Sequence, residues 1–204
     1  DPYLHSIISV LLFKGFGGAG SKIIPAAVAV ELAHQFMQVH TDVQDGDPKT
    51  PDKHSVWWIW GPAQAINAGD ALHALSRLSL FDLTHAGFKQ SMILEAIKTF
   101  DTACLTLFEG QFAEIKAQEQ LTLSKSQYIE MTQRKVGALF GCAFELPVML
   151  SGGDGASIQK SRLAGQDIGL AFQIYDEIQQ IWGAQATTSP SSSLLNKKKC
   201  LPII

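Results

Sequence analysis

The sequence predicts an all-α fold, a large helical bundle that forms a single domain over residues 1–204. Apolar residues recur at helical spacing in long segments, most of them over twenty residues, and each segment is apolar on one side. No segment alternates apolar and polar residues as a half-buried strand would. Long amphipathic helices without strands favour a bundle over an α/β fold. The residues leave open whether further helices precede or follow this chain.

The first helix is predicted over residues 2–14, where a proline in the first turn is followed by apolar residues at helical spacing. The glycine-rich turn at 15–20 has no preceding strand and no following Gly-Lys-Ser/Thr. We therefore interpret it as a helix–helix linker and not as a phosphate loop. The second helix starts at Ser21 or Pro25 and ends near Asp45.

A polar loop with two prolines is predicted at 46–56, and an aromatic-rich stretch follows at 57–60. Ser124 is a suitable N-cap, and Gly152–Gly155 marks a break between helices. Residues 184–196 are rich in Ser and Thr and are expected to form a loop. The four later helices are predicted over residues 62–83, 87–116, 124–150 and 156–182.

Composition argues against several classes of protein. The net charge is −3 and the basic run Lys197–Lys199 is short, so no nucleic-acid binding is expected. The apolar runs are interrupted before the roughly 18–20 residues of a membrane span. The start lacks the basic segment of a signal peptide. The three cysteines are widely spaced, without metal-ligand spacing or a disulfide pattern, so we expect a reducing, cytoplasmic location.

Two acidic pairs are the candidate metal ligands. Asp42 and Asp45 are three residues apart and share one helix face, and a second pair follows far downstream at 176–177. Oxygen ligands at a helix end can bind a hard cation such as Mg²⁺. Taken by themselves, such pairs are also common on solvated helix faces. We interpret His34 and His40 as hydrogen-bonded helix residues and not as metal ligands.

Six motifs, two of which contain these acidic pairs, occur in one order along nearly the whole chain, and together they carry a resemblance. They are Glu-Leu-Ala-His at 31–34 leading into His-Thr-Asp-Val-Gln-Asp at 40–45, the signature at 60–70, Glu-Gly-Gln at 109–111, Arg-Lys-Val-Gly at 134–137, the acidic segment at 172–183 and Lys-Lys-Lys-Cys-Leu-Pro at 197–202. Through these six motifs the chain resembles the trans-type isoprenyl (polyprenyl) diphosphate synthase family.

The resemblance implies an all-helical, usually dimeric fold with a deep apolar cavity, so a homodimer is expected. It implies that Mg²⁺ at the cavity mouth holds the diphosphate of an allylic prenyl substrate and helps to expel it. The metal ligands would be Asp42, Asp45, Asp176 and Glu177. Lys135 and Gln111 would act in catalysis and, with Lys198, bind the diphosphate. The cavity would be lined by Phe36, Met37, Phe140 and Phe172, for which core packing is the simpler interpretation.

The motifs depart from the family pattern in a consistent direction. Thr41 stands where the first motif has its first aspartate, and Glu177 and Gln180 replace acids of the second. The loop at 46–55 lacks the paired arginines that would hold isopentenyl diphosphate. Arginine is not readily replaced in a phosphate clamp. The site of the second substrate is therefore more altered than that of the allylic one. Val136 after Lys135, Thr188-Ser189-Pro190 and the missing upstream Gly-Lys-x-x-Arg are further departures.

Three functions remain open. The favoured one is a terpene-synthase-like enzyme that ionises a single allylic diphosphate, because the arginines are absent. The second is a short-chain prenyltransferase whose isopentenyl diphosphate is held by Lys49, Lys53 or His54. Phe36, five residues before Thr41, would then form the floor of a short cavity. The third is a non-catalytic partner subunit.

Overall fold

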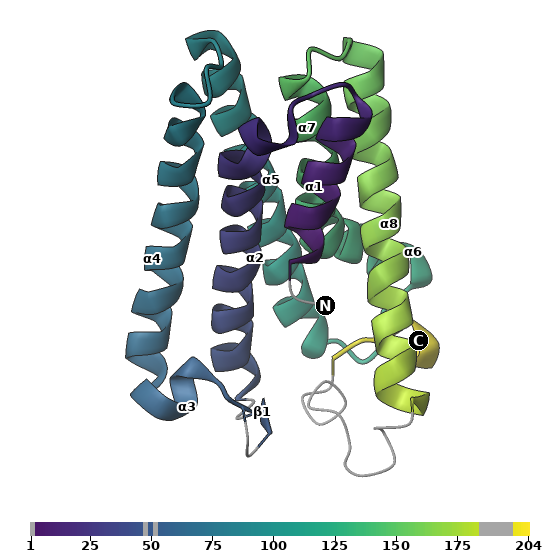
Figure 1. The fold of residues 1–204 in the computed structure, drawn as a ribbon. Coiled ribbons are helices and arrows are strands. Elements are labelled where there is room, and N and C mark those ends of the chain that lie inside the picture. Colours follow the sequence, from purple (N-terminus) through teal and green to yellow (C-terminus); the bar gives the residue numbers. More distant parts are fainter. Residues whose placement is uncertain (1–2, 47–48, 51–52, 184–197) are drawn as a thin grey trace.

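The computed structural model describes residues 3–46, 49–50, 53–183 and 198–204 and confirms the all-α fold. The long helices run roughly along one axis and build a bundle (Figure 1). They are α1 (Leu4–Gly15), α2 (Ile24–Asp45), α4 (Pro62–Phe81), α5 (Gln90–Gln118), α7 (Ala138–Leu150) and α8 (Gly155–Trp182). The shorter elements are η1 (Gly20–Ile23), α3 (Val56–Trp60), η2 (Asp82–Thr84), α6 (Lys125–Thr132), η3 (Gln133–Gly137) and η4 (Leu201–Ile203). No helix in the described ranges is long and apolar enough to cross a membrane.

Two local features differ from the sequence prediction. Within the expected loop, β1 (Lys49–Thr50) pairs antiparallel with β2 (Lys53–His54), and strands of two residues are too short to show an alternating pattern. The expected single helix over 124–150 is divided into α6, the π-helical turn η3 and α7. A π-turn holds one extra residue per turn, which apolar periodicity does not reveal. The predicted loop at 184–196 lies outside the described residues.

Helix ends are set by identifiable caps. Ser124 begins α6 with a capping box, in which its side chain and that of Gln127 each bond the other's backbone, so this prediction is confirmed. Asp154 caps α8, because its carboxylate accepts a hydrogen bond from the Ser157 backbone N–H at 2.7 Å. Gly46 adopts φ 60° and ends α2 directly after Asp45. The acidic end of α2 therefore coincides with the helix end.

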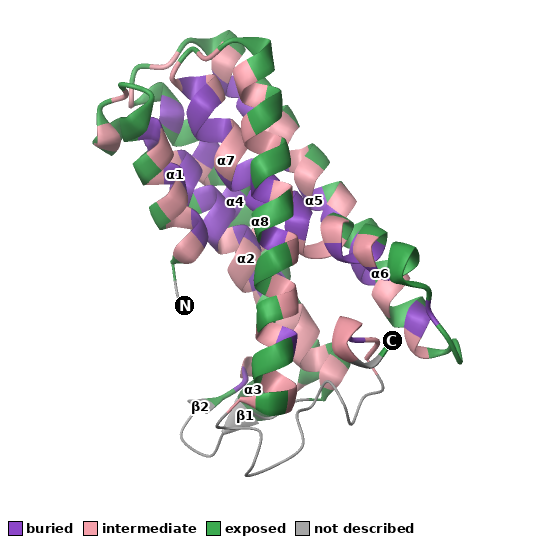
Figure 2. Cartoon of the chain, turned by 90° about the vertical axis from the view of Figure 1, so that its right-hand side faces the viewer, coloured by how far each residue is buried: buried purple, intermediate pink, exposed green. Residues whose placement is uncertain are grey.

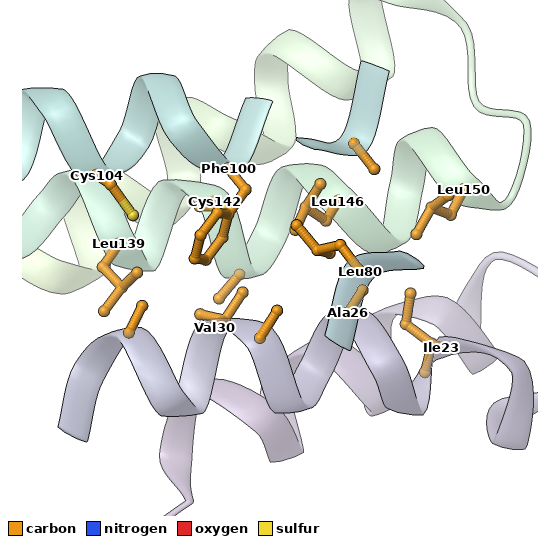
Figure 3. Close-up of a cluster of buried hydrophobic side chains, with 14 of the residues drawn as sticks. Ile23, Ala26, Val30, Leu80, Phe100, Cys104, Leu139, Cys142, Leu146 and Leu150 are labelled. Atoms are coloured by element: carbon orange, nitrogen blue, oxygen red, sulfur yellow. The ribbon is translucent and has the colours of Figure 1, made fainter. Parts of the chain in front are cut away.

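The main core lies where α1, α2, α5 and α7 meet. In Figure 3, Val30 of α2 lies close to Phe100 of α5 and Leu146 of α7, and all three side chains are buried. Burial of each such side chain contributes about 1.5–3 kcal/mol. Cys104 and Cys142 lie in the same cluster as free thiols, and burial raises the pKa of Cys104 to about 12. These two cysteines are therefore core residues.

Helices α7 and α8 approach each other closely through glycines. A Cβ added to Gly165 would lie 2.6 Å from the carbonyl oxygen of Phe140, and one at Gly169 would lie 3.0 Å from the Cα of Gly137. Because these neighbouring atoms belong mostly to backbone, no side-chain rotation relieves the overlap. In Figure 2 the outer face of α8 is exposed, whereas buried residues gather where α1, α2 and α7 meet behind it.

His5 makes the stability of the bundle depend on pH. Its side chain is 5% exposed, and burial, together with the nearby His34, lowers the pKa to about 3 from the ordinary 6.5. At a pH between these two pKa values, His5 is protonated in the unfolded chain and neutral in the folded chain. Acid therefore destabilises the fold. Above pH 6.5 this effect is absent.

We expect the free energy of unfolding to fall by up to about 1.4 kcal/mol per pH unit below pH 6.5. Urea unfolding at pH 7, 6 and 5 measures this slope. The variant H5F should make it shallower, with part of the slope kept by His34 and His73, whose pKa values burial also lowers, whereas H85F, at an imidazole that is 85% exposed, should leave it as in the wild type. Equal slopes for H5F and the wild type would contradict the assignment.

Candidate functional site

The two acid-bearing helices end on the same side of the bundle. The C-terminal ends of α2 and α8 both lie at the lower end of Figure 1, next to the last described segment, 198–204. This segment joins them, because Lys198 contacts Asp45 of α2 and the Leu201 backbone N–H donates to Glu177 of α8. The structure thus brings both predicted acidic motifs to one end of the fold.

A partly buried array of alternating charges lies at this end. The Lys198 Nζ is 2.6 Å from an oxygen of Asp45 and 3.9 Å from one of Glu114. The Lys135 Nζ donates to the same Glu114 oxygen at 2.5 Å. All four side chains are at most 17% exposed. The two lysines that the sequence proposed as diphosphate ligands therefore share one carboxylate partner.

Glu114 is the residue of this array that sequence reasoning missed. Burial by itself would raise its pKa, but the charges of Lys135 and Lys198 outweigh burial and hold the pKa below its ordinary value. A carboxylate between two lysines stays ionised and keeps both ammonium groups in place. The sequence contained a signal for its place in the site, because Glu114 follows the predicted site residue Gln111 by three residues and therefore shares its helix face.

The π-turn η3 and Gly110 of α5 together position Lys135. A Cβ added to Gly110 would lie 2.6 Å from the Cα of Lys135 and 2.7 Å from the carbonyl carbon of Arg134. The backbone of η3 therefore rests directly on α5 at a position that only glycine fits. π-Turns recur at functional sites in proteins, where they reorient side chains. Arg134 turns outward and pairs with Glu109 at 2.9 Å and Glu130 at 3.0 Å.

Gln111 links α5 to α2 at the same end. Its side-chain amide donates a hydrogen bond to the side-chain oxygen of Gln44, one residue before Asp45. Gln111 is 7% exposed, and its own Oε1 has no hydrogen-bond partner among the described residues. Such an unsatisfied buried acceptor is costly, because its desolvation is not compensated. It fits a donor brought in by a ligand or by bound water.

Glu177 is placed in a buried network. Its Oε1 accepts hydrogen bonds from the Tyr128 hydroxyl at 2.8 Å and from Gln173 at 3.0 Å, and its Oε2 accepts from the Leu201 N–H at 2.9 Å. Burial and the bond to Glu177 raise the pKa of Tyr128, which therefore stays a donor. The neighbouring Asp176 accepts from Gln180 at 2.6 Å. Gln180 is neutral where the family pattern has an acid, and its side-chain amide donates a hydrogen bond to Asp176, one helical turn earlier.

The four predicted cavity residues form two groups, one on α2 and one shared by α7 and α8. Phe36 is 1% exposed, and its ring lies against His40, His73 and Phe108 at centroid distances of 5.6, 5.0 and 5.7 Å. Met37, at 8% exposed, is buried in the main core. Phe140 is buried, whereas Phe172 is 39% exposed, and their ring centroids are 5.6 Å apart.

The interpretation of His40 as a hydrogen-bonded helix residue is confirmed. Its Nε2 lies 3.3 Å from the Ile66 carbonyl oxygen and 3.6 Å from the Asp70 carboxylate. In the β1–β2 hairpin, Lys49 is opposite His54 and Lys53 is opposite Thr50, and only the backbone is described at Lys49, Thr50 and Lys53. Lys197 and residues 188–190 lie outside the described residues.

Comparison with known proteins decides the family. The family model for polyprenyl synthetase matches residues 4–204. The chain belongs to the polyprenyl synthetase family. It is 34% identical over 204 residues to a geranylgeranyl diphosphate synthase of Mycobacterium tuberculosis, covering 99% of this chain and 57% of that protein. The resemblance stated from the motifs is thereby confirmed.

Solved structures of polyprenyl synthetases share the fold. A geranylgeranyl pyrophosphate synthetase from Geoglobus acetivorans superimposes with a TM-score of 0.89 at 29% identity, over 100% of this chain and 63% of that one. A polyprenyl synthetase from Streptomyces coelicolor superimposes with a TM-score of 0.85 at 35% identity, over 96% and 57%. The chain thus spans about three-fifths of the length of these polyprenyl synthetases.

The donor set at this end of the chain fits Mg²⁺ in part. Among the described residues no three His, Cys, Asp or Glu side chains converge as a metal cluster. Mg²⁺ is usually held by one or two carboxylates together with substrate phosphates, so a complete protein cage is not required. Asp42, Asp45 and Asp176 supply suitable oxygens, and the orphaned Gln111 Oε1 fits a metal-bound water. Both oxygens of Glu177 already accept hydrogen bonds within the protein.

The Lys198 ammonium pairs with Asp45, and a cation bound at this carboxylate would compete with it. In K198M, Asp45 and Glu114 lose a shared positive charge, so we expect Mg²⁺ to bind about tenfold more tightly in the absence of diphosphate. Isothermal titration calorimetry measures this affinity. K160M, at an exposed position of α8, should bind Mg²⁺ as the wild type does. Weaker Mg²⁺ binding by K198M would contradict the competition.

Proposed function

We propose that this chain carries the site of a class I isoprenoid-diphosphate enzyme, a short-chain prenyltransferase that uses Mg²⁺ and an allylic prenyl diphosphate. The observation that carries the proposal is the partly buried array of Lys135, Glu114, Lys198 and Asp45 at the end where both acidic helices terminate. Two lysines held in place by carboxylates form a ready receptor for a polyanion. The relatives named geranylgeranyl and farnesyl diphosphate synthases support chain elongation.

In this proposal the described residues divide the work. Lys135 and Lys198 exchange their carboxylate partner for diphosphate oxygens, and Gln111 orients the bound group. Asp42, Asp45 and Asp176 would hold Mg²⁺, which would supply neutralisation of the charge on the departing diphosphate. Glu177 positions Asp176, because its bonds to Tyr128 and Leu201 fix the last turns of α8.

The prenyl tail would lie in the interior of the bundle, inward from this end. An allylic cation needs a dry environment and aromatic faces, which stabilise positive charge. Phe140 and Phe172 lie next to one another on α7 and α8, the helices that follow Lys135 and carry Asp176. Phe36 faces α4 and α5 through His73 and Phe108 and would close that side. These assignments extend the sequence predictions to the positions that the structure gives.

A single-substrate terpene synthase is the second candidate. The absence of both arginines from residues 46–55 favours it, and this absence led the sequence prediction. The names of the relatives shift our preference to the prenyltransferase, in which Lys49, Lys53 or His54 would hold isopentenyl diphosphate. A non-catalytic partner subunit is the remaining alternative, for which Thr41 is the main support.

A homodimer is part of the proposal. Large apolar side chains remain exposed on α4 and α5, namely Ile66, Leu75, Leu78, Phe81, Leu94, Leu105, Phe112 and Ile115. A second copy would cover them, since monomers rarely expose extended apolar patches. Analytical ultracentrifugation of wild type and L78E tests this expectation. We also keep the prediction of a reducing, cytoplasmic setting, supported by three free thiols.

Product analysis tests the function. Allylic diphosphates of ten, fifteen and twenty carbons are offered with Mg²⁺, each with and without isopentenyl diphosphate, and both diphosphate release and product mass are measured. A longer prenyl diphosphate formed only with isopentenyl diphosphate supports the prenyltransferase. A hydrocarbon or alcohol formed without it favours the terpene synthase. No release in any mixture overturns catalysis by this chain.

A further inference from the structure

The 198–204 segment is fixed at two points that lie three residues apart. At the first point the Lys198 ammonium pairs with Asp45 of α2 at 2.6 Å. At the second point the Leu201 backbone N–H donates to the Glu177 Oε2 of α8 at 2.9 Å. Because three residues of extended chain span at most about 10 Å, the bond at Leu201 limits how far the backbone of Lys198 can move.

Tyr128 of α6 completes the attachment at Leu201. Its side chain is fully buried, and its hydroxyl donates to the Glu177 Oε1 at 2.8 Å. Gln173, one turn before Glu177 on α8, donates to the same oxygen at 3.0 Å. The Glu177 carboxylate is 5% exposed and therefore meets three donors with its two oxygens. Rotation of this carboxylate away from Leu201 would break bonds in a buried setting, where unpaired polar groups are costly.

Apolar packing holds the same part of the segment. Leu201 packs against a small buried cluster formed by Ala117, Leu123, Tyr128 and Met131. Cys200, between the two fixed points, is 3% exposed, and burial raises its pKa to about 11. Figure 1 shows this end of the chain beside the last turns of α8 and near α6. Residues 200 and 201 are thus docked on α6 and α8 by contacts that do not involve the charged array.

The length of the side chain at position 177 suits this attachment. Glutamate is one methylene longer than the aspartate that the family pattern has there. Glu177 reaches the Tyr128 hydroxyl with one oxygen and the Leu201 N–H with the other. An aspartate in the same place could not keep both bonds unless α8 or the 198–204 segment moved. The departure from the family pattern therefore coincides with the docking of this segment.

We propose that Tyr128 is a positioning residue that acts through Glu177, anchoring the 198–204 segment and thereby holding Lys198 where diphosphate binds. This inference rests on the proposed function, because it concerns the diphosphate site of that function. It assigns a role to α6, which lies outside every motif from which the resemblance was read. Tyr128 acts on diphosphate through Lys198, so its effect should disappear when Lys198 is removed.

Titration with inorganic diphosphate in the absence of Mg²⁺ tests this role by calorimetry. Y128F keeps the ring and removes the donor, and we expect it to bind diphosphate about tenfold more weakly than the wild type. Y3F, at a tyrosine that is 62% exposed, should bind as the wild type does. Adding Y128F to K198M should cause no further loss beyond that of K198M itself. A further tenfold loss in the double variant would overturn the role, because Tyr128 would then act without Lys198.

E177D tests the attachment from its other side. It restores the residue of the family pattern and keeps the negative charge, but it shortens the side chain that joins Tyr128 to Leu201. We expect diphosphate to bind about tenfold more weakly without Mg²⁺. E119D, at an exposed glutamate, is the matched control and should keep the wild-type affinity. Wild-type affinity in E177D as well would overturn the inference.

Thiol labelling detects the docked segment without any ligand. The protein is treated with a maleimide, and peptide mass spectrometry gives the labelling rate of each cysteine. In Y128F and E177D we expect Cys200 to react about tenfold faster, because it leaves its buried position. Cys104 and Cys142, in the main core, should react as in the wild type. An unchanged rate at Cys200 overturns the inference, and so does equal acceleration at all three cysteines, which indicates general loosening.

Failure of the proposed function is distinguishable from failure of this inference. If the wild type neither binds inorganic diphosphate nor releases it from allylic substrates, the proposed function fails. The labelling rates of Cys200 then still decide whether Tyr128 and Glu177 anchor the segment. If the wild type binds diphosphate and Y128F binds it equally well, the inference fails and the proposed function stands.

Discussion

The double variant D42N/D45N is expected to lose about a thousandfold in the rate of diphosphate release with allylic substrates. A bound metal contributes several kcal/mol to transition states that develop charge on phosphate oxygens, and each 1.36 kcal/mol is tenfold in rate. Asparagine is close to aspartate in size and leaves helix α2 intact, but the two substitutions remove both negative charges at the end of this helix. Lys198, which pairs with Asp45 at 2.6 Å and with Glu114 at 3.9 Å, also loses the closer of its two carboxylate partners.

Three comparisons make this result specific. D167N changes an exposed aspartate of α8 and should release diphosphate at the wild-type rate. T41D, which restores an acid at the altered first position of the motif, should bind Mg²⁺ more tightly than the wild type. Rates for D42N/D45N within threefold of the wild type would show that these carboxylates are not the metal site.

Replacing Gly110 with alanine is expected to destabilise the protein and to weaken diphosphate binding together. The new Cβ would lie 2.6 Å from the Lys135 Cα, so the backbone of η3 must move away from α5. Overpacking of this kind costs about 1–3 kcal/mol, against a gain of about 1 kcal/mol in helix propensity. The same movement separates Lys135 from Glu114, which are 2.5 Å apart in the native fold.

Thermal unfolding and inorganic diphosphate titration measure the two effects of G110A. We expect a melting temperature lower by several degrees, at roughly 2–4 °C per kcal/mol for a chain of this size. Diphosphate affinity should fall about tenfold. G155A is the matched control, since nothing lies within 4 Å of a Cβ at this first residue of α8. A G110A protein with wild-type stability and affinity would show that α5 does not position Lys135.

The fold could be predicted because its signals are local. Apolar periodicity found α1, α2, α4, α5 and α8 within a few residues of their observed ends but did not find the start of α7, and Ser124 was identifiable as a cap from its residue type and position. The acidic pairs could be found because their spacing places them on one helix face. The all-α class and the family followed from these local patterns and from the order of the motifs.

The missed features depend on contacts between distant residues. The pairing of Lys135 with Glu114 spans 21 residues of sequence, and that of Lys198 with Asp45 spans 153. Neither pair has a periodic signature. The π-turn at 133–137 is set by its packing on Gly110, and apolar spacing does not show it. Glu177 has an acidic side chain like Asp176, and only the structure shows that its two oxygens bond Tyr128 and Leu201.

The contact between Lys198 and Asp45 has a thermodynamic consequence for the order in which ligands bind. In the proposed site, a metal at Asp45 would free the Lys198 ammonium, and diphosphate that takes up this ammonium would free Asp45 for the metal. Each ligand would therefore remove an obstacle to the other, which is positive cooperativity within one site. By linkage, the factor by which Mg²⁺ raises diphosphate affinity would equal the factor by which diphosphate raises Mg²⁺ affinity. The Lys198–Asp45 pair would thus couple the binding of the metal to that of the diphosphate.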